Sequence, residues 1–287
     1  MQDVRIVSLL PSATEILCAL GAGADLVGVT DECNYPERVV GLPKVSRAAL
    51  PTNLSSTEID EWVSRARHEG QDLYHLDADL IADLDPDLIV TQALCDVCAP
   101  ASSRVAAIAG EATVVTLDPH TLHDVIGTFT TLGAACHREA AAADLAGKFR
   151  RRLAASWRAG LGYQPPRVAL LEWTDPPFAP GHWIPEMVEL AGGNNVLGQA
   201  GERSVRTAWS EVRAAAPDLV ICAPCGFDLD NAAALAADLP DLGVPVWAVD
   251  ADASFARPGP RLIEGIEALV SIINPHRTPT DQARRVR

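Results

Sequence analysis

Short runs rich in Val, Ile and Leu alternate along the chain with longer stretches of helical periodicity. Most of these runs lack a strict alternation of apolar and polar residues, as is typical of strands that are covered on both faces. Strands that alternate with helices in this way predict a parallel α/β architecture. The expected strands cover residues 5–9, 26–29, 88–91, 112–117, 167–172, 219–222 and 245–249.

Two segments of the chain look like diverged copies of one another. Residues 85–90 read Asp-Pro-Asp-Leu-Ile-Val and residues 216–221 read Ala-Pro-Asp-Leu-Val-Ile, and a Cys-x-x-Cys pair follows each strand. A second echo links residues 20–28 with residues 190–198, where glycines suit the positive φ of a helix C-terminus. The repetition predicts two lobes of related design.

Between the two copies, residues from about 121 to 159 read as one long helix or as two nearly continuous helices. The predicted fold is therefore α/β, with two Rossmann-like lobes whose parallel sheets are joined by a long backbone helix. The expected boundaries are residues 1–120 for the N-terminal lobe, 121–160 for the connecting helix, 161–275 for the C-terminal lobe and 276–287 for a polar, basic and flexible tail.

The expected strand order also indicates where a ligand would bind. Ligands of open parallel sheets bind outside the carboxyl ends of the strands. Two lobes facing one another would place their post-strand loops around a shared ligand cleft. The loops concerned are residues 11–14, 30–36, 92–100, 173–183 and 223–228.

Composition narrows the range of functions. The formal net charge is −15, and an acidic surface repels nucleic-acid phosphates and anionic lipids. No apolar run approaches the roughly 18 residues that a membrane-spanning helix requires. We therefore expect neither nucleic-acid binding nor membrane insertion.

The start of the chain and its cysteines bear on location. The first expected strand follows the initial Met almost directly, without a signal peptide before it. The cysteines number 7, and an odd count suits a reducing compartment better than a disulfide scaffold. We expect a cytoplasmic location, or a periplasmic or extracellular one if a signal peptide has been trimmed.

Six short motifs follow one another in a characteristic order. They are SLLPSATE at 8–15, ECNYP at 32–36, DPPF at 175–178, GHW at 181–183, ELAGG at 189–193 and FARPGPR at 255–261. Together they resemble the cobalamin-binding proteins that serve ABC importers and, more broadly, the helical-backbone class of substrate-binding proteins for corrinoids, haem and iron siderophores. The resemblance covers about residues 4–272. It implies a non-enzymatic binder of cobalamin or a related corrinoid, with haem or a ferric siderophore as alternatives.

A flat, partly apolar macrocycle requires aromatic faces and a few polar groups at its edge. Aromatic residues gather in the expected post-strand loops, and the resemblance assigns ligand contacts to Tyr35 and Phe255 and a basic edge contact to Arg257. Backbone N–H groups at the start of the first helix could bind ligand carbonyls. The predicted ligand-binding residues are Pro11, Ser12, Tyr35, Trp173, Phe178, His182, Trp183, Phe255 and Arg257.

Each of these residues also has an ordinary structural interpretation. The aromatic side chains could pack in the core, and Ser12 could be a plain helix N-cap. His182 could ligate a corrin cobalt, contact a polar edge of the ligand, or lie on the surface at the entry of a helix.

The two Cys-x-x-Cys pairs are Cys95 with Cys98 and Cys222 with Cys225. Four thiolates could bind zinc or an iron–sulfur cluster. A thiol near the corrin cobalt, a redox-labile pair and inert packing are the other interpretations. No P-loop, dinucleotide-binding, nucleophile-elbow or HExxH motif occurs, so the sequence does not indicate any of these common enzyme classes. The enzymatic alternative that the cysteines leave is thiol-assisted corrinoid processing by Cys95, Cys98 or Cys225.

The resemblance also implies how the chain would meet an importer. Importer-linked relatives dock on membrane subunits through one acidic residue of each lobe, which corresponds here to Asp79 and to Ser210. Glu211 lies one step from Ser210, about 100° around a helix, and residues 55–74 form an insertion before Asp79. Asp79 and Glu211 are the candidate docking residues. Because Glu211 would point away from the position of Ser210, and because of the insertion before Asp79, we expect docking on ABC importer membrane subunits to be lost.

Overall fold

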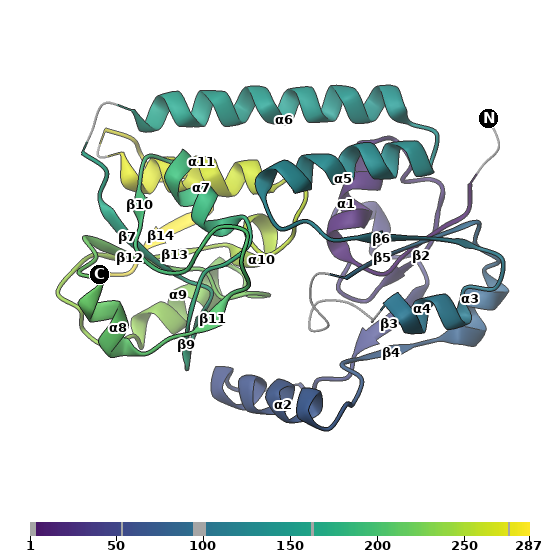
Figure 1. The fold of residues 1–287 in the computed structure, drawn as a ribbon, viewed down its shortest axis with the longest axis horizontal. Helices are drawn as coiled ribbons and strands as arrows, with labels where there is room; N and C mark the ends of the chain where they lie inside the picture. Colours follow the sequence, from purple (N-terminus) through teal and green to yellow (C-terminus); the bar gives the residue numbers. More distant parts are fainter. Residues whose placement is uncertain (1–3, 53, 94–101, 162–163, 275) are drawn as a thin grey trace. The chain divides into compact units, whose positions relative to one another are not determined.

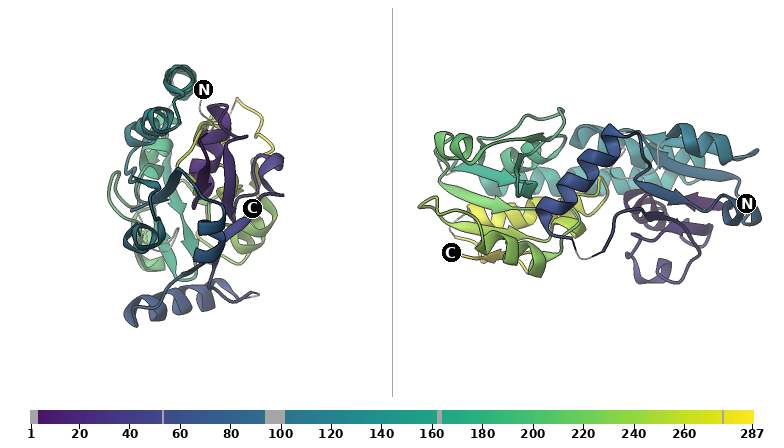
Figure 2. Two further views of the ribbon diagram at one scale, coloured as in Figure 1. Left: turned by 90° about the vertical axis from the view of Figure 1, so that its right-hand side faces the viewer. Right: turned by 90° about the horizontal axis from the view of Figure 1, so that it is seen from below.

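The computed structural model describes residues 4–287 except residues 53, 94–101, 162–163 and 275 (Figure 1). The chain divides into two compact units. Unit 1 comprises residues 1–119 and 124–147, and unit 2 comprises residues 120–123 and 148–287. Figure 2 gives two further views of the same elements. Because each unit has its own sheet, each is described by itself.

Unit 1 contains a six-stranded sheet in the order β4-β3-β2-β1-β5-β6. Neighbouring strands are parallel, except that β4 runs antiparallel to β3. The central strand β1 is fully buried, as strands covered by helices on both faces are. The elements are β1 (Ile6–Ser8), α1 (Pro11–Ala19), β2 (Leu26–Thr30), the 3-10 helix η1 (Glu37–Val39), β3 (Lys44–Ala48), α2 (Ser56–His68), β4 (Tyr74–Leu76), α3 (Ala78–Asp83), β5 (Leu88–Gln92), α4 (Ser102–Ile108) and β6 (Thr113–Leu117).

Unit 2 contains a five-stranded sheet in the order β10-β7-β12-β13-β14 and a separate three-stranded sheet in the order β11-β9-β8. The larger sheet is parallel except for β14, and the smaller sheet is antiparallel. The elements are β7 (Arg167–Leu171), β8 (Trp173–Thr174), β9 (Pro177–Ala179), α7 (Ile184–Leu190), β10 (Asn194–Asn195), β11 (Val205–Arg206), α8 (Trp209–Ala214), β12 (Leu219–Cys222), α9 (Leu229–Ala237), β13 (Val246–Val249), α10 (Ala251–Ser254), α11 (Leu262–Ile273) and β14 (Ala283–Arg285).

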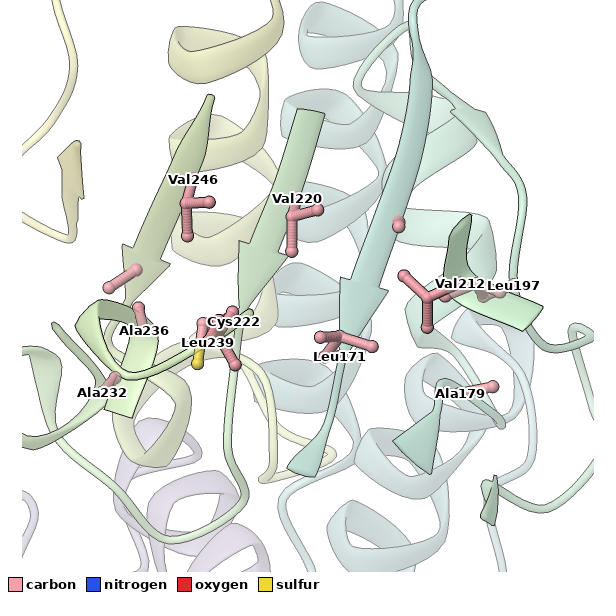
Figure 3. Close-up of a cluster of buried hydrophobic side chains, with 12 residues drawn as sticks. Leu171, Ala179, Leu197, Val212, Val220, Cys222, Ala232, Ala236, Leu239 and Val246 are labelled. Carbon is pink, nitrogen blue, oxygen red and sulfur yellow. The ribbon is translucent and has the colours of Figure 1, made fainter. Parts of the chain in front are cut away.

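The core of unit 2 forms where helix α9 packs on strands β12 and β13. Val220 and Val246 from the strands and Ala232 and Ala236 from α9 are all fully buried, and Figure 3 shows their side chains in one cluster. Small alanines on the helix face let its backbone approach the sheet closely. This rigid interior positions the loops that leave the carboxyl ends of the strands.

Two helices connect the sheets along the chain: α5 (Leu122–Ala135) and α6 (Glu139–Gly160). The second of the two expected arrangements, a pair of nearly continuous helices, is therefore confirmed. His137, with a φ of 55°, lies in the break between them. The boundary between the units falls within α6, so that this helix belongs to both.

Arg5, which immediately precedes β1, forms a set of hydrogen bonds with Leu84, Asp85 and Asp87 that we call the arginine clasp of unit 1. Nε of Arg5 donates to the carbonyls of Leu84 (3.0 Å) and Asp85 (3.1 Å), and Nη2 donates to Leu84 again (2.7 Å). The backbone N–H of Arg5 donates to the Asp87 carboxylate (2.8 Å). The clasp thus satisfies carbonyls that the end of helix α3 leaves without intrahelical partners.

Unit 2 contains the same clasp at the equivalent place. Nε of Arg167 donates to the carbonyls of Ala215 (3.2 Å) and Ala216 (3.0 Å), and Nη2 donates to Ala215 (2.6 Å). The backbone N–H of Arg167 donates to the Asp218 carboxylate (2.7 Å). Asp85 and Ala216, with φ values of 43° and 42°, occupy the same turn position. The related design of the two lobes, expected from the repeated segments, is confirmed.

The expected fold class is confirmed, and all seven strands predicted from apolar runs are present as β1, β2, β5, β6, β7, β12 and β13. The glycines of the second echo, Gly21 and Gly192, have φ values of 80° and 92° just after α1 and α7, as predicted. The tail expected to be flexible instead contributes β14, whose residues Ala283–Arg285 pair antiparallel with β13. Within the described ranges, the helices are too short or too polar to span a bilayer.

Candidate ligand-binding site

In unit 1 the carboxyl end of β1 leads directly into helix α1. Pro11 is the first residue of α1 and Leu10 is its N-cap, so that Ser12 lies inside the helix and is not the cap. The Ser12 side chain is buried. The Thr14 hydroxyl donates to the Ser8 hydroxyl (2.8 Å) and lies 3.0 Å from the Cys33 sulfur, which ties the helix start to the strand and to the loop after β2.

Tyr35 lies in that loop after β2 and is among the few large apolar side chains that the described residues expose. Its side chain is 47% exposed. Nearby, the Tyr74 hydroxyl donates to the Glu32 carboxylate at 3.4 Å, which links β4 to the same loop. An aromatic ring that is accessible at the carboxyl end of a parallel sheet is the feature predicted for a macrocycle contact.

In unit 2 the carboxyl end of β7 turns into the hairpin of β8 and β9. Trp173 pairs with Phe178 across this hairpin, and Phe178 pairs with Arg206 across β9 and β11. The Arg206 guanidinium carbon lies 5.9 Å from the centre of the Phe178 ring. Trp173 also meets Phe227, which follows β12, edge to face, with ring centroids 5.4 Å apart. The three aromatic rings are half-buried.

Glu172 connects this hairpin to its surroundings. Its carboxylate accepts hydrogen bonds from the backbone N–H of Gly181 (3.0 Å) and from the Ser204 hydroxyl. Its backbone N–H donates to the Phe178 carbonyl (3.1 Å), and its carbonyl accepts from the N–H of Cys225 (3.1 Å). One residue therefore links β9, the segment before β11 and the loop after β12.

Trp183 and Phe255, by contrast, lie in the interior of unit 2. Trp183 is 4% exposed and Phe255 is 1% exposed, and the Trp183 indole N–H donates to the Phe255 carbonyl (2.9 Å). His182 has a φ of 49°, and its ring lies 5.7 Å from that of His120 and 5.6 Å from that of Trp183. Burial of this kind matches the core-packing interpretation of Trp183 and Phe255, and a direct ligand contact of any of these three residues stays a prediction.

Arg257 pairs with a carboxylate within unit 2. It is buried, and its Nη2 contacts both oxygens of Asp252, at 2.9 and 2.8 Å. Asp250 precedes this pair at the end of β13, and burial raises its pKa. The negative charges of Asp252 and Asp228 add to that effect, whereas the positive charge of Arg261 opposes it. The post-strand loop is thus held by internal charge pairing.

The cysteines of the second Cys-x-x-Cys pair lie in opposite environments. Cys222 is fully buried at the end of β12, and burial raises the pKa of its thiol to about 12, whereas Cys225 is exposed. Metals bind the thiolate form, which Cys222 resists. Cys95 and Cys98 lie outside the described residues. Among the residues that are described, no group of three or more acidic, His or Cys side chains could hold a metal ion, and the four-cysteine site stays a prediction.

Both predicted docking carboxylates are exposed at helix starts. Asp79 lies in the first turn of α3. The Glu211 carboxylate accepts hydrogen bonds from the Thr207 hydroxyl (2.6 Å) and the Ala208 N–H (2.9 Å), which lowers its pKa. Glu211 thereby caps the N-terminus of α8. The insertion before Asp79 forms α2.

The structure brings Trp173 and Phe178 together and places Tyr35, Pro11 and Ser12 at the corresponding end of the unit 1 sheet. Sequence reasoning missed Phe227 and Arg206. A signal existed for Phe227, because it lies in the expected post-strand loop 223–228. Arg206 gave no such signal, since the two-residue strand β11 has no apolar pattern.

Comparison with known proteins gives similar sequences and folds. Vitamin B12-binding protein of Yersinia pestis is 26% identical over 267 residues, covering 92% of this chain and 84% of that protein. The crystal structure of the periplasmic vitamin B12 binding protein of Vibrio cholerae has a TM-score of 0.67 and 23% identity, covering 94% of this chain and 96% of that one. A periplasmic heme binding protein from Pseudomonas aeruginosa has a TM-score of 0.72 and 20% identity, covering 98% of this chain and 97% of that one.

The family match covers most of both units. Residues 6–239 match the family model described as periplasmic binding protein. The matched range contains the first five of the six motifs that carried the sequence resemblance, up to ELAGG at 189–193. The chain belongs to the periplasmic binding protein family.

Proposed function

We propose that this chain binds a corrinoid, cobalamin or a close relative, as a solute-binding protein and not as an enzyme. The observation that carries the proposal is the cluster of Trp173, Phe178 and Phe227 at the carboxyl ends of β7 and β12. Half-buried aromatic faces of this kind suit a large flat ring, which gains both apolar burial and ring contacts there.

Sequence relatives favour a corrinoid over other macrocycles. The vitamin B12-binding protein of Yersinia pestis is similar over 92% of this chain, and the motifs around Pro11 and Tyr35 lie within the family match. Haem is the second candidate ligand, because the heme binding protein from Pseudomonas aeruginosa has a TM-score of 0.72. A scaffold shared by several ligands does not by itself select among them.

Within this function the predicted residues take two roles. Tyr35, Trp173 and Phe178 offer accessible rings and are proposed as ligand contacts. Trp183 and Phe255 are proposed as supports, because a ring that is 4% or 1% exposed offers little surface to a ligand.

Titration of the purified protein with cyanocobalamin and with haemin tests the proposal. Binding should appear as a shift of the corrin absorption bands at one ligand per chain, together with quenching of tryptophan fluorescence. Trp173→Ala should weaken that binding by at least about tenfold, since burial of an aromatic face is worth on the order of 1–3 kcal/mol. Trp157→Ala, which removes an exposed tryptophan of α6, is the matched control.

No response to any corrinoid at tens of micromolar, with tight haemin binding, would select the second candidate. Turnover separates the enzymatic alternative. A thiol-dependent enzyme would consume cyanocobalamin repeatedly in the presence of a reductant and lose that activity on Cys225→Ser, whereas a binding protein takes up one equivalent.

The family also changes the expected location. Its members serve ABC importers, and the similar proteins of Vibrio cholerae and Pseudomonas aeruginosa are periplasmic, which supports a periplasmic location and not the cytoplasmic one expected from the sequence. Fractionation of the host cell would test this. Co-purification with importer membrane subunits, compared between the wild type and Asp79→Ala, would test the predicted loss of docking.

A further inference from the structure

Three side chains form a row on one face of the small sheet of unit 2. Trp173 is the register partner of Phe178, and Phe178 is the register partner of Arg206. Directly opposed residues of antiparallel strands point to the same face of the sheet. The row therefore consists, in order, of the Trp173 indole, the Phe178 phenyl ring and the Arg206 guanidinium. Phe227 contacts the Trp173 ring edge to face.

The cation at the end of this row suits one kind of ligand group. Arg206 is exposed, and its guanidinium stacks over the Phe178 ring at 5.9 Å. Such stacking limits the orientations of the planar fork, which matches the two oxygens of a carboxylate or phosphate. The formal net charge of the chain is −15, so that a cation beside the aromatic faces departs from the overall charge.

Hydrogen bonds hold this strand where the row forms. The Thr207 N–H donates to the Pro177 carbonyl (2.8 Å), and the Ser204 hydroxyl donates to the Glu172 carboxylate. Both residues flank the two-residue strand that carries Arg206. The backbone of Arg206 is therefore held in β11 and does not belong to a free loop.

We propose that Arg206 binds an acidic group on the edge of the flat ligand whose ring lies against Trp173 and Phe178. The inference rests on the proposed function and adds the ligand class to it: a macrocycle with an anionic edge. The shared chemistry has two sources, the phosphodiester of a complete corrinoid and the carboxylates of a porphyrin. Arg206 is then a residue that sets ligand specificity.

The test compares ligands with and without the acidic group. Dissociation constants of the wild type, Arg206→Gln and Arg206→Lys are measured for cyanocobalamin and for dicyanocobinamide, which lacks the phosphodiester. The same variants are measured with haemin and with its dimethyl ester. Arg203→Gln is the matched control, because Arg203 is an exposed arginine three residues earlier.

Arg206→Gln should weaken binding of the acid-bearing ligand by about tenfold or more and flatten its salt dependence, since a charge-assisted pair is lost. It should change binding of the matching acid-free ligand less than about twofold, and Arg203→Gln should leave both unchanged. The pair that responds, corrinoid or porphyrin, identifies the source of the acidic group.

Two results would overturn the inference, and they differ. If the wild type binds a macrocycle but Arg206→Gln weakens both members of each pair equally, Arg206 does not read the acidic edge and the proposed function stands. If the wild type binds none of the four ligands, the proposed function fails and the inference fails with it.

Discussion

Cys222 and Cys225 are three residues apart, yet one is fully buried and the other is exposed. The thiolate is the reactive form of cysteine, and burial raises the pKa of Cys222 to about 12. The two thiols should therefore differ sharply in reactivity, which bears on any redox or metal chemistry of the pair.

Labelling of the native protein with a maleimide near neutral pH should separate these thiols. Cys225→Ser should remove about one equivalent of rapid labelling, because the Cys225 thiol is exposed to the reagent. Cys222→Ser should leave the rapid equivalents unchanged, and counting of labels by mass spectrometry measures both. Equal loss in the two variants would contradict the burial of Cys222.

The Asp250 carboxyl group should make the stability of the protein depend on pH. Burial raises its pKa above the ordinary value of 3.8, so the folded state holds the proton more tightly than the unfolded state does. The contribution of this group to stability is then present below pH 3.8 and is lost as the pH rises through the folded-state pKa.

Asp250→Asn removes the charge but keeps a side-chain oxygen that can accept a hydrogen bond from the Ala253 N–H. In the wild type this N–H lies 3.0 Å from the Asp250 carboxylate oxygen. The free energy of unfolding of this variant, relative to the wild type, should therefore be higher (the variant relatively more stable) at pH 7 than at pH 3.5. Urea denaturation at the two pH values measures the difference. Asp83→Asn, at an exposed position of α3, is the control. A larger relative gain at pH 3.5 would reverse the sign and refute the argument.

At the scale of elements, the segment that follows β9 and the segment that precedes β11 approach closely because Gly181 has no side chain. A Cβ on Gly181 would meet the backbone of Ser204, Arg203 and Glu202. Backbone atoms cannot move aside as a flexible side chain can, so that these two segments would have to separate.

Gly181→Ala should lower the free energy of unfolding by about 1–3 kcal/mol, the usual cost of overpacking. It should also weaken macrocycle binding, because the row of Trp173, Phe178 and Arg206 depends on this approach. Gly127→Ala is the control, since a Cβ there meets nothing within 4 Å and alanine favours the helix α5. Thermal unfolding and ligand titration of both variants give the comparison.

Sequence reasoning found the elements that carry a strong apolar pattern and missed those held by pairing alone. The predicted strands β1, β5 and β12 are rich in Ile, Val and Leu and lie inside their sheets. By contrast, β14 reads Ala-Arg-Arg and β3 reads Lys-Val-Ser-Arg-Ala, so that neither stands out from a loop. Their neighbours in the sheets, distant in sequence, supply the hydrogen bonds that make them strands.

The candidate site was predicted in part for the same reason. Motifs and post-strand position identified Trp173, Phe178 and Tyr35, whereas the pairing of Arg206 with Phe178 depends on register between β9 and β11. Register is set by tertiary contacts, which no local pattern reveals. Burial of Phe255 and Trp183 likewise depends on how α10 and α7 pack in unit 2.

At the scale of the whole molecule, each unit is held by its own arginine clasp. Arg5 closes the unit 1 sheet and Arg167 closes the unit 2 sheet, with the same set of backbone acceptors. The two clasps share no residue, so that loss of one should weaken one unit and spare the other.

Native-state hydrogen exchange of Arg5→Ala and Arg167→Ala tests this independence. Arg5→Ala should speed exchange in β1 and β5, and Arg167→Ala should do so in β7 and β12, by the roughly tenfold that loss of 1–2 kcal/mol of hydrogen bonding gives. Each variant serves as the control for the other. Faster exchange throughout both units in either variant would mean that they unfold as one.

The paired clasps also bear on the origin of the chain. The same arrangement recurs, with Arg167 162 residues after Arg5 and with the carbonyl acceptors and Asp218 131 residues after their counterparts, as tandem copying of an ancestral half-length gene would leave it. If the two halves arose in this way, the loops at the carboxyl ends of the strands diverged, while the hydrogen bonds of Arg5 and Arg167 at the opposite ends of the sheets were retained. Superposition of Arg5 on Arg167 would then align Asp87 with Asp218, and a reconstructed ancestor would be expected to assemble from two identical halves.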